Sequence, residues 1–111
     1  MSEERRIAKR VDTQPGSIVV LDRISQTSLG TIANISSTGF MLVTDRFIEI
    51  DSVFQLNLAS DGLDTSFDIG AVCLWTTEAS SADSFWSGFH IIDISDSAQA
   101  DLDIVVKKIS A

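Results

Sequence analysis

Residues 65–75, which read TSFDIGAVCLW, form the longest strand that the sequence predicts. Apolar residues recur at every second position, the period of a β-strand with one face turned to a core. We therefore expect one buried face made of Phe67, Ile69, Ala71, Cys73 and Trp75. Residues 85–93 alternate in the same way, with Phe85, Ser87, Phe89 and Ile91 set against Trp86, Gly88, His90 and Ile92. A Ser, Ala and Asp turn between the two segments indicates neighbouring strands.

Four shorter segments upstream also read as strands. They are rich in β-branched, Leu and Phe residues and cover residues 17–23, 28–34, 39–44 and 53–58. Between the first two of them, Ser25, Gln26 and Thr27 form a predicted polar turn. Six strands at short spacing favour an antiparallel barrel or sandwich.

The period changes to that of a helix near the end of the chain. One stripe at i, i+4, i+7 and i+11 consists of Ala98, Leu102, Val105 and Ile109. Either Ser95 or Asp96 can cap the first turn. We predict a C-terminal helix at about residues 96–109, packed on the barrel.

Size and composition fit a single globular domain of 111 residues, 44% of them hydrophobic. No stretch reaches the ~18 consecutive apolar residues that span a bilayer. No apolar segment follows the charged N-terminus as in a secretory signal, so we predict a cytoplasmic location. With one cysteine and one histidine, neither an internal disulfide nor a zinc site is expected. Cys73 lies on the apolar face, where a thiol is buried and inert.

Positive charge is concentrated at the start of the chain. Four of the eight Lys and Arg residues lie within residues 5–10, so residues 1–10 carry a formal charge of +2. The remainder carries −10, which gives the net charge of −8. Such an acidic body argues against duplex nucleic acid, whose binding needs several Lys or Arg contacts to phosphate. The cluster suits either a small anionic ligand or docking on an acidic surface.

The basic cluster belongs to a segment that differs from the strands after it. Residues 1–15 are polar, lack apolar periodicity and end at Pro15, next to Gly16. We predict that residues 1–15 form a flexible N-terminal arm, and that residues 16–111 form the barrel and its helix.

Two short motifs carry chemistry. Arg6 and Arg10 are four residues apart, so they share a face in a helical turn or an extended arm. A guanidinium group makes paired hydrogen bonds to phosphate or to the N7 and O6 edge of guanine. In Asn34-x-Ser36-x-x-Gly39, the Asn and Ser side chains can meet the edge of a base. Gly39 supplies a positive φ or lets a ligand approach the backbone.

Together these elements resemble the PilZ domain family. Arg6 to Arg10 matches its RxxxR element, and Asn34 to Gly39 matches its (Asp/Asn)-x-Ser-x-x-Gly element. The resemblance covers nearly the whole chain and implies an all-β fold with one helix, a six-stranded antiparallel β-barrel with a C-terminal α-helix. It also implies binding of cyclic di-GMP, a bacterial second messenger. By this resemblance, Arg6 and Arg10 contact phosphate and guanine, Asn34 and Ser36 contact a guanine, and Gly39 completes the site.

The resemblance extends to further residues. Arg5 stands just before RxxxR, where an arginine in the family accompanies an intercalated ligand dimer. Asn34 replaces the commoner Asp and offers no negative charge to the N–H donors of guanine. Lys9 is a secondary candidate. So is Trp75, which is otherwise core or barrel rim, because an aromatic ring can partner a base or an arginine.

We predict a receptor or adaptor and not an enzyme, with no cofactor or metal. The ligand would order the arm over the barrel and alter a surface that an unidentified downstream protein reads. The alternative is a PilZ-like adaptor that binds only a protein partner through its arm. A hydrolase has the least support, because no nucleophile–base pair accompanies His90.

Overall fold

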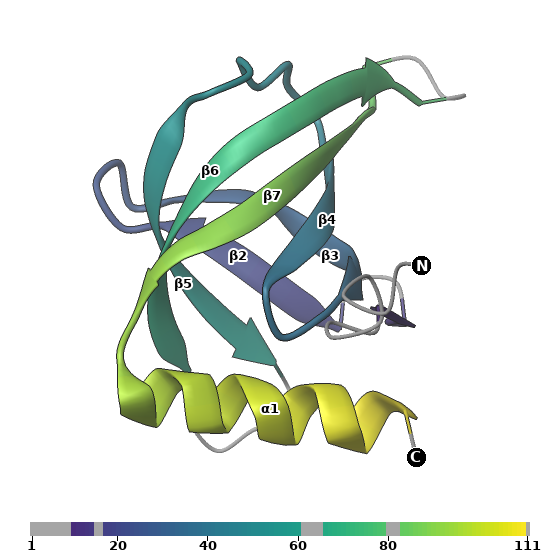
Figure 1. Cartoon of the computed structure of the whole chain (residues 1–111). Coiled ribbons are helices and arrows are strands. Elements are labelled where there is room, and N and C mark those ends of the chain that lie inside the picture. Colours follow the sequence, from purple (N-terminus) through teal and green to yellow (C-terminus); the bar gives the residue numbers. More distant parts are fainter. Residues whose placement is uncertain (1–9, 15–16, 61–65, 80–82, 111) are drawn as a thin grey trace, which may run out of the picture.

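The computed structural model describes residues 10–14, 17–60, 66–79 and 83–110. Within these ranges the strands are β1 (Val11–Asp12), β2 (Ile18–Asp22), β3 (Thr27–Ile35), β4 (Gly39–Thr44), β5 (Val53–Ser60), β6 (Phe67–Glu78) and β7 (Phe85–Ile94). The helix is α1 (Asp96–Ser110). Strands pair in the order β3-β2-β5-β6-β7-β4, and β4 pairs again with β3, which closes the barrel (Figure 1). The predicted six-stranded antiparallel barrel with a C-terminal helix is confirmed.

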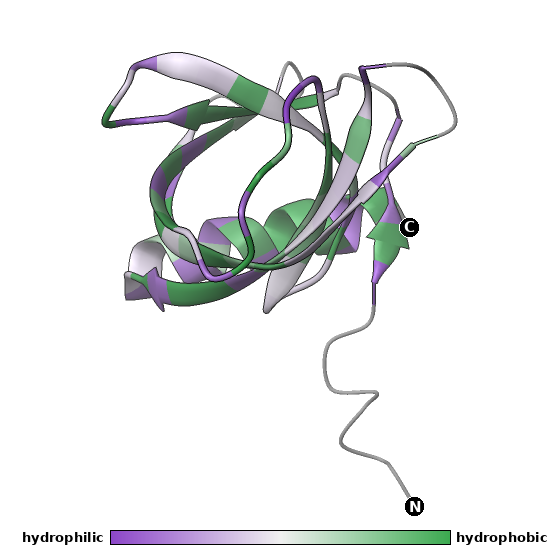
Figure 2. Cartoon of the chain, turned by 90° about the horizontal axis from the view of Figure 1, so that it is seen from above, coloured by the Kyte–Doolittle hydropathy of each residue, from purple (hydrophilic) through white to green (hydrophobic). Residues whose placement is uncertain are grey.

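Period-two alternation puts apolar side chains inside the barrel. Phe67, Ile69, Ala71 and Cys73 are buried as predicted, and the Phe40 and Phe89 rings stack with centroids 5.2 Å apart. The other apolar strand residues with 1% exposure or less are Val20, Ile32, Ile35, Leu42, Leu56 and Leu58. The strands form a ring around this core (Figure 2).

Helix α1 lies across one end of the barrel (Figures 1 and 2). Of its predicted stripe, Ala98, Leu102 and Val105 are buried and Ile109 is partly buried, and Leu102 has no exposed surface. Of the two predicted caps, Ser95 fills the role, because its Oγ accepts a hydrogen bond from the Ala98 N–H at 3.1 Å. The Gln99 Nε2 donates to the Ser37 carbonyl oxygen at 3.3 Å, which ties the helix to the β3–β4 hairpin.

Residues 11 and 12, which the sequence placed in the arm, form the short strand β1. Val11 pairs with Ile35 and Asp12 pairs with Asn34. Val11 is buried, and the Thr13 N–H donates to the Ala33 carbonyl oxygen at 3.0 Å, which extends the pairing. The described structure therefore begins, at residue 10, beside the end of β3. Residues 1–9 of the predicted arm lie outside the described residues.

A β-bulge changes the predicted face of Trp75. Cys73 pairs with Phe89, and Trp75 pairs with the adjacent Gly88. Leu74 is therefore the extra, unpaired residue of a bulge in β6. The extra residue reverses the alternation. Cys73 therefore points into the core, while Trp75 lies outside and is 38% exposed. The prediction that Trp75 shares the buried face of Cys73 is wrong.

A second bulge acts in the same way on β3. Ile32 pairs with Leu42 and Asn34 pairs with Met41, so Ala33 is the extra residue on β3. Ile32 is buried in the core, and Asn34 after the bulge is only partly buried. The bulge thereby turns Asn34 to the outer face of the barrel.

Candidate functional site

The hairpin between β3 and β4 is built around Ser36. Its Oγ accepts hydrogen bonds from the Thr38 and Gly39 N–H groups at 3.2 and 3.1 Å, and it donates to the Gly39 carbonyl oxygen at 3.2 Å. The side chain is 1% exposed. A hydroxyl bonded in this way replaces backbone partners that a tight turn leaves unpaired. Ser36 thus sits in the frame of the hairpin, away from its outer surface.

Gly39 is required by the approach of β7. Its φ is not in the left-handed region, since among the described glycines only Gly30 has a positive φ. A Cβ at position 39 would lie 2.4 Å from the Phe89 carbonyl oxygen. The close approach of the β7 backbone, and not a positive φ, therefore explains why a glycine stands at position 39.

Arg10 and Asn34 are brought into contact by β1. Arg10 directly precedes Val11, and the pairing of β1 with β3 holds this end of the chain beside Asn34. The Arg10 Nη1 donates a hydrogen bond to the Asn34 Oδ1 at 3.0 Å. Arg10 is exposed and Asn34 is partly buried, so the guanidinium group still has donors that face solvent.

Asn34 begins a row of directly paired residues that crosses four strands. Asn34 pairs with Met41, Met41 with Gly88, and Gly88 with Trp75. Directly opposed residues of an antiparallel sheet point to the same face. We call Asn34, Met41, Gly88 and Trp75 the outer row.

The indole of Trp75 lies over Gly88. A Cβ on Gly88 would fall 2.1 Å from the Trp75 Nε1 and 2.4 Å from its Cε2. Gly88 therefore leaves room for the ring to lie on the sheet, and the ring in turn covers Gly88, which is buried. The outer row thus carries an amide at one end and an aromatic ring at the other.

The structure divides the predicted site residues into three groups. Arg10, Asn34 and Trp75 lie on or beside the outer row, Ser36 and Gly39 form the hairpin frame, and Arg5, Arg6 and Lys9 lie outside the described residues. Met41 belongs to the row but no motif indicated it. Its position between the apolar Phe40 and Leu42 in a period-two strand was the available signal.

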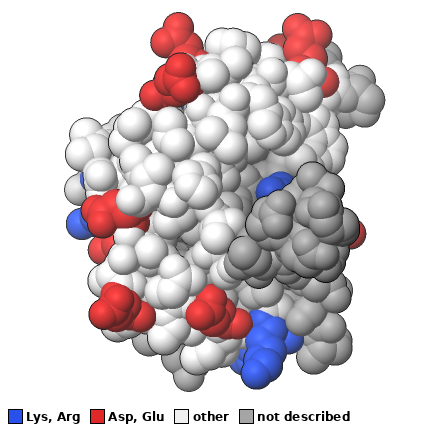
Figure 3. Space-filling model, in the orientation of Figure 1, with Lys and Arg blue, Asp and Glu red and all other residues white. Residues whose placement is uncertain are grey.

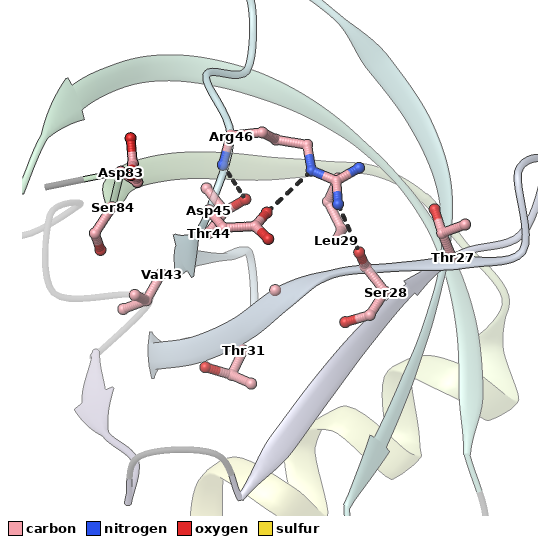
Figure 4. A pocket seen from close by; sticks show the side chains of 11 residues that line it. Thr27, Ser28, Leu29, Thr31, Val43, Thr44, Asp45, Arg46, Asp83 and Ser84 are labelled. Carbon is pink, nitrogen blue, oxygen red and sulfur yellow. Dashed lines mark hydrogen bonds and ion pairs between the residues drawn. The ribbon is translucent and has the colours of Figure 1, made fainter.

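A separate open hollow lies at the other end of β3 and β4 (Figure 4). It is lined by the start of β3, the end of β4, Asp83 and Ser84. Arg46 lines it too, with Nε 3.2 Å from the Asp45 Oδ1 and Nη2 donating to the Ser28 carbonyl oxygen at 3.5 Å. Because Asp45 neutralises the guanidinium group of Arg46, this hollow should bind an anion less well than the surface around Arg10.

Acidic side chains outnumber basic ones among the described residues. On the face that carries β6 and β7, acidic side chains lie mainly toward the edge, and Lys or Arg side chains appear at the left and lower edges and beside the grey residues (Figure 3). Among the described residues, no group of three or more His, Cys, Asp or Glu side chains could hold a metal ion. In the same part of the chain, no helix has the length and apolar character needed to cross a membrane.

Comparisons with known proteins agree with this fold. A family model described as the PilZ domain matches residues 4–107. The structure of the Bacillus subtilis inhibitor of motility (MotI/DgrA) is similar with a TM-score of 0.75 at 16% identity, over 94% of this chain and 50% of that one. The PilZ domain of YcgR from Escherichia coli with c-di-GMP gives 0.74 at 12% identity, over 96% and 92% of the two chains.

A crystal structure of Escherichia coli YcgR in complex with c-di-GMP is also similar, with a TM-score of 0.75 at 15% identity, over 96% of this chain and 46% of that one. The chain thus spans about half the length of MotI and of this YcgR chain. At these identities the likeness shows a common fold. No curated protein sequence matches the chain.

Proposed function

The chain belongs to the PilZ domain family, and from this premise we propose that it is a cyclic di-GMP receptor or adaptor without enzymatic activity. The contact between Arg10 and Asn34 carries the proposal. It joins the two sequence elements, 24 residues apart, at one place on the barrel. The Escherichia coli PilZ domain with the same fold is described with c-di-GMP, which supports this choice of ligand.

The outer row supplies complementary chemistry for such a ligand. Arg10, together with Arg5 and Arg6, binds phosphate oxygens and the N7 and O6 edge of guanine. Asn34 offers hydrogen bonds to the edge of a base, and Trp75 offers an aromatic face for stacking. Ser36 and Gly39 hold the hairpin that positions Asn34. Arg5 and Arg6, together with Arg10, give enough cationic groups for an intercalated ligand dimer.

Signalling follows from the position of Arg10 beside the barrel. A ligand bound by Arg5, Arg6 and Arg10 holds residues 1–9 against the outer row and orders them there. Fixing a backbone residue costs about 1–2 kcal/mol, so several charge-assisted hydrogen bonds must form together to offset it. The surface around β1 and β3 then differs between the free and bound states, and a downstream protein reads that difference.

A thermal-shift experiment tests the proposal. Cyclic di-GMP at 100 times its dissociation constant stabilises the folded protein by about 2.7 kcal/mol, which raises the melting temperature. GTP carries the same base and more phosphate charge but lacks the cyclic dinucleotide geometry, and should not raise it. Calorimetric titration then gives the affinity and distinguishes one bound ligand from two.

Equal melting temperatures with and without cyclic di-GMP, up to millimolar ligand, would refute the proposal that the chain is a receptor for this nucleotide. That result would leave an adaptor that binds only a protein partner.

A further inference from the structure

Met41 lies in the middle of the outer row, between Asn34 and the residue that Trp75 covers. It pairs directly with Asn34 on one side and with Gly88 on the other. Its neighbours along β4, Phe40 and Leu42, are fully buried. The alternation of the strand therefore turns Met41 to the outer face, where its side chain is partly exposed.

The indole of Trp75 reaches the strand beside Met41. Its Nε1 lies 2.1 Å from the position that a Cβ on Gly88 would take. Directly paired Cβ atoms on neighbouring strands are about 5 Å apart, so the indole nitrogen lies within roughly 7 Å of the Cβ of Met41. A thioether makes favourable contacts with aromatic rings. Met41 and Trp75 are therefore near neighbours on the outer face of the sheet.

On its other side, Met41 contacts the amide of Asn34. The Asn34 Nδ2 donates to the Met41 Sδ at 3.9 Å, while the Asn34 Oδ1 accepts from Arg10 at 3.0 Å. The two contacts hold opposite ends of the same amide. They fix which end donates and which accepts, and thereby define the hydrogen bonds that the amide can offer to a base.

We propose that Met41 is a further ligand-binding and positioning residue, whose thioether is the surface on which one guanine of cyclic di-GMP lies. The inference rests on the proposed function. A polarisable, apolar side chain suits the face of a purine, and a base lying on Met41 has Asn34 at its edge and Trp75 beside it. Arg10, at the outer side of Asn34, then meets the phosphate.

Selective labelling of methionine tests this directly. The chain contains two methionines, so protein labelled with ¹³C in the methionine methyl groups gives two methyl signals, and Met41→Leu identifies the one from Met41. With cyclic di-GMP at saturation, the ring current of the guanine should shift the Met41 signal. A Met41 signal that does not move at saturation would overturn the inference.

Affinity provides the second measurement. Met41→Ala should weaken binding about tenfold, the lower end of what a lost apolar contact costs in a binding site. Met41→Leu, which keeps the volume but not the sulfur, should lose less. Val43→Ala is the matched control, because Val43 lies on the same strand and face but pairs with Thr31 and Trp86, outside the outer row. It should bind as the wild type does.

The outcomes separate the two proposals. Wild-type protein that takes up no cyclic di-GMP would refute the proposed function and this inference with it. Wild-type binding with an unmoved Met41 signal, or with equal affinity of Met41→Ala and Val43→Ala, would refute the role of Met41 alone. Thermal melts of each variant show that the comparison is made between folded proteins.

Discussion

The two halves of the hairpin motif differ in what their side chains contact. Ser36 and Gly39 are buried, where Ser36 bonds the turn itself and Gly39 lies against the backbone of β7. Asn34, two residues before Ser36, faces outward and contacts Arg10 and Met41. One short segment therefore both builds a frame and presents a side chain on it.

This contrast predicts two kinds of defect. A substitution in the frame should lower the free energy of unfolding, and ligand binding should suffer only because less protein is folded or the hairpin is displaced. A substitution on the outer row should change the affinity for cyclic di-GMP and leave the unfolding free energy nearly constant. Measurements of the unfolding free energy and of the affinity on the same variants decide whether frame residues and outer-row residues differ in this way.

The largest effect is expected for Gly39→Ala. The new Cβ would lie 2.4 Å from the Phe89 carbonyl oxygen, so β4 and β7 must separate. Overpacking of this kind costs about 3 kcal/mol, and urea denaturation should show the free energy of unfolding lower by that amount.

Gly70→Ala is the matched control, since the nearest atom to its Cβ is a side-chain atom, the Cβ of Asp93, at 3.1 Å. It should lower the free energy of unfolding by less than about 1 kcal/mol. If both variants are equally stable, the close approach of β7 does not explain Gly39.

Ser36→Ala should come next, with a loss of about 2 kcal/mol in the free energy of unfolding. The substitution removes the acceptor of the Thr38 and Gly39 N–H groups, and the latter is buried. Ser37 accepts a hydrogen bond from Gln99 through its backbone carbonyl, which a substitution of the side chain leaves in place. The neighbouring Ser37→Ala should therefore change the free energy of unfolding by less than about 0.5 kcal/mol. If the Ser36→Ala protein is as stable as the wild type but no longer binds cyclic di-GMP, then Ser36 contacts the ligand and does not stabilise the hairpin.

Arg10→Ala should show the opposite behaviour. Its side chain is exposed, so the free energy of unfolding should stay within about 0.5 kcal/mol of the wild type. The affinity for cyclic di-GMP should fall at least about tenfold, roughly 1.4 kcal/mol, because charge-assisted contacts to the ligand are lost. Arg46→Ala removes another exposed guanidinium group, at the other end of β3 and β4, and calorimetry should find the affinity for cyclic di-GMP unchanged.

Most of the barrel could be predicted from local patterns. The alternation in residues 67–73 and 85–93 and the helical stripe of Ala98, Leu102 and Val105 reflect burial on one face, which the order of apolar residues records directly. Strand β1 could not be predicted in this way, because two residues are too short to show a period. Its pairing with β3 depends on contacts with residues more than twenty positions away.

The faces of the site residues were harder to predict for a related reason. Whether Leu74 and Ala33 are extra residues in their strands depends on the register of the partner strands, and no local pattern reports that register. Trp75 was therefore assigned to the wrong face, and the outward turn of Asn34 was not foreseen. The resemblance to the PilZ family did assign Arg10 and Asn34 to one predicted site, and the structure brings these two side chains into contact.

Asn34→Asp, a substitution on the outer row, should change the affinity for cyclic di-GMP and has the smallest effect that we expect. A carboxylate at this position accepts charge-assisted hydrogen bonds from the N–H donors of guanine, and it also attracts Arg10, now 3.0 Å away. Arg10 has five N–H donors, so it can keep this contact and still bind phosphate. We expect about threefold tighter binding, roughly the 0.6 kcal/mol of an exposed charged pair. The gain should vanish at about 1 M salt, where such pairs are screened. Weaker binding would mean that the carboxylate withdraws Arg10 from the ligand, and then position 34 controls affinity through Arg10 and not through the base.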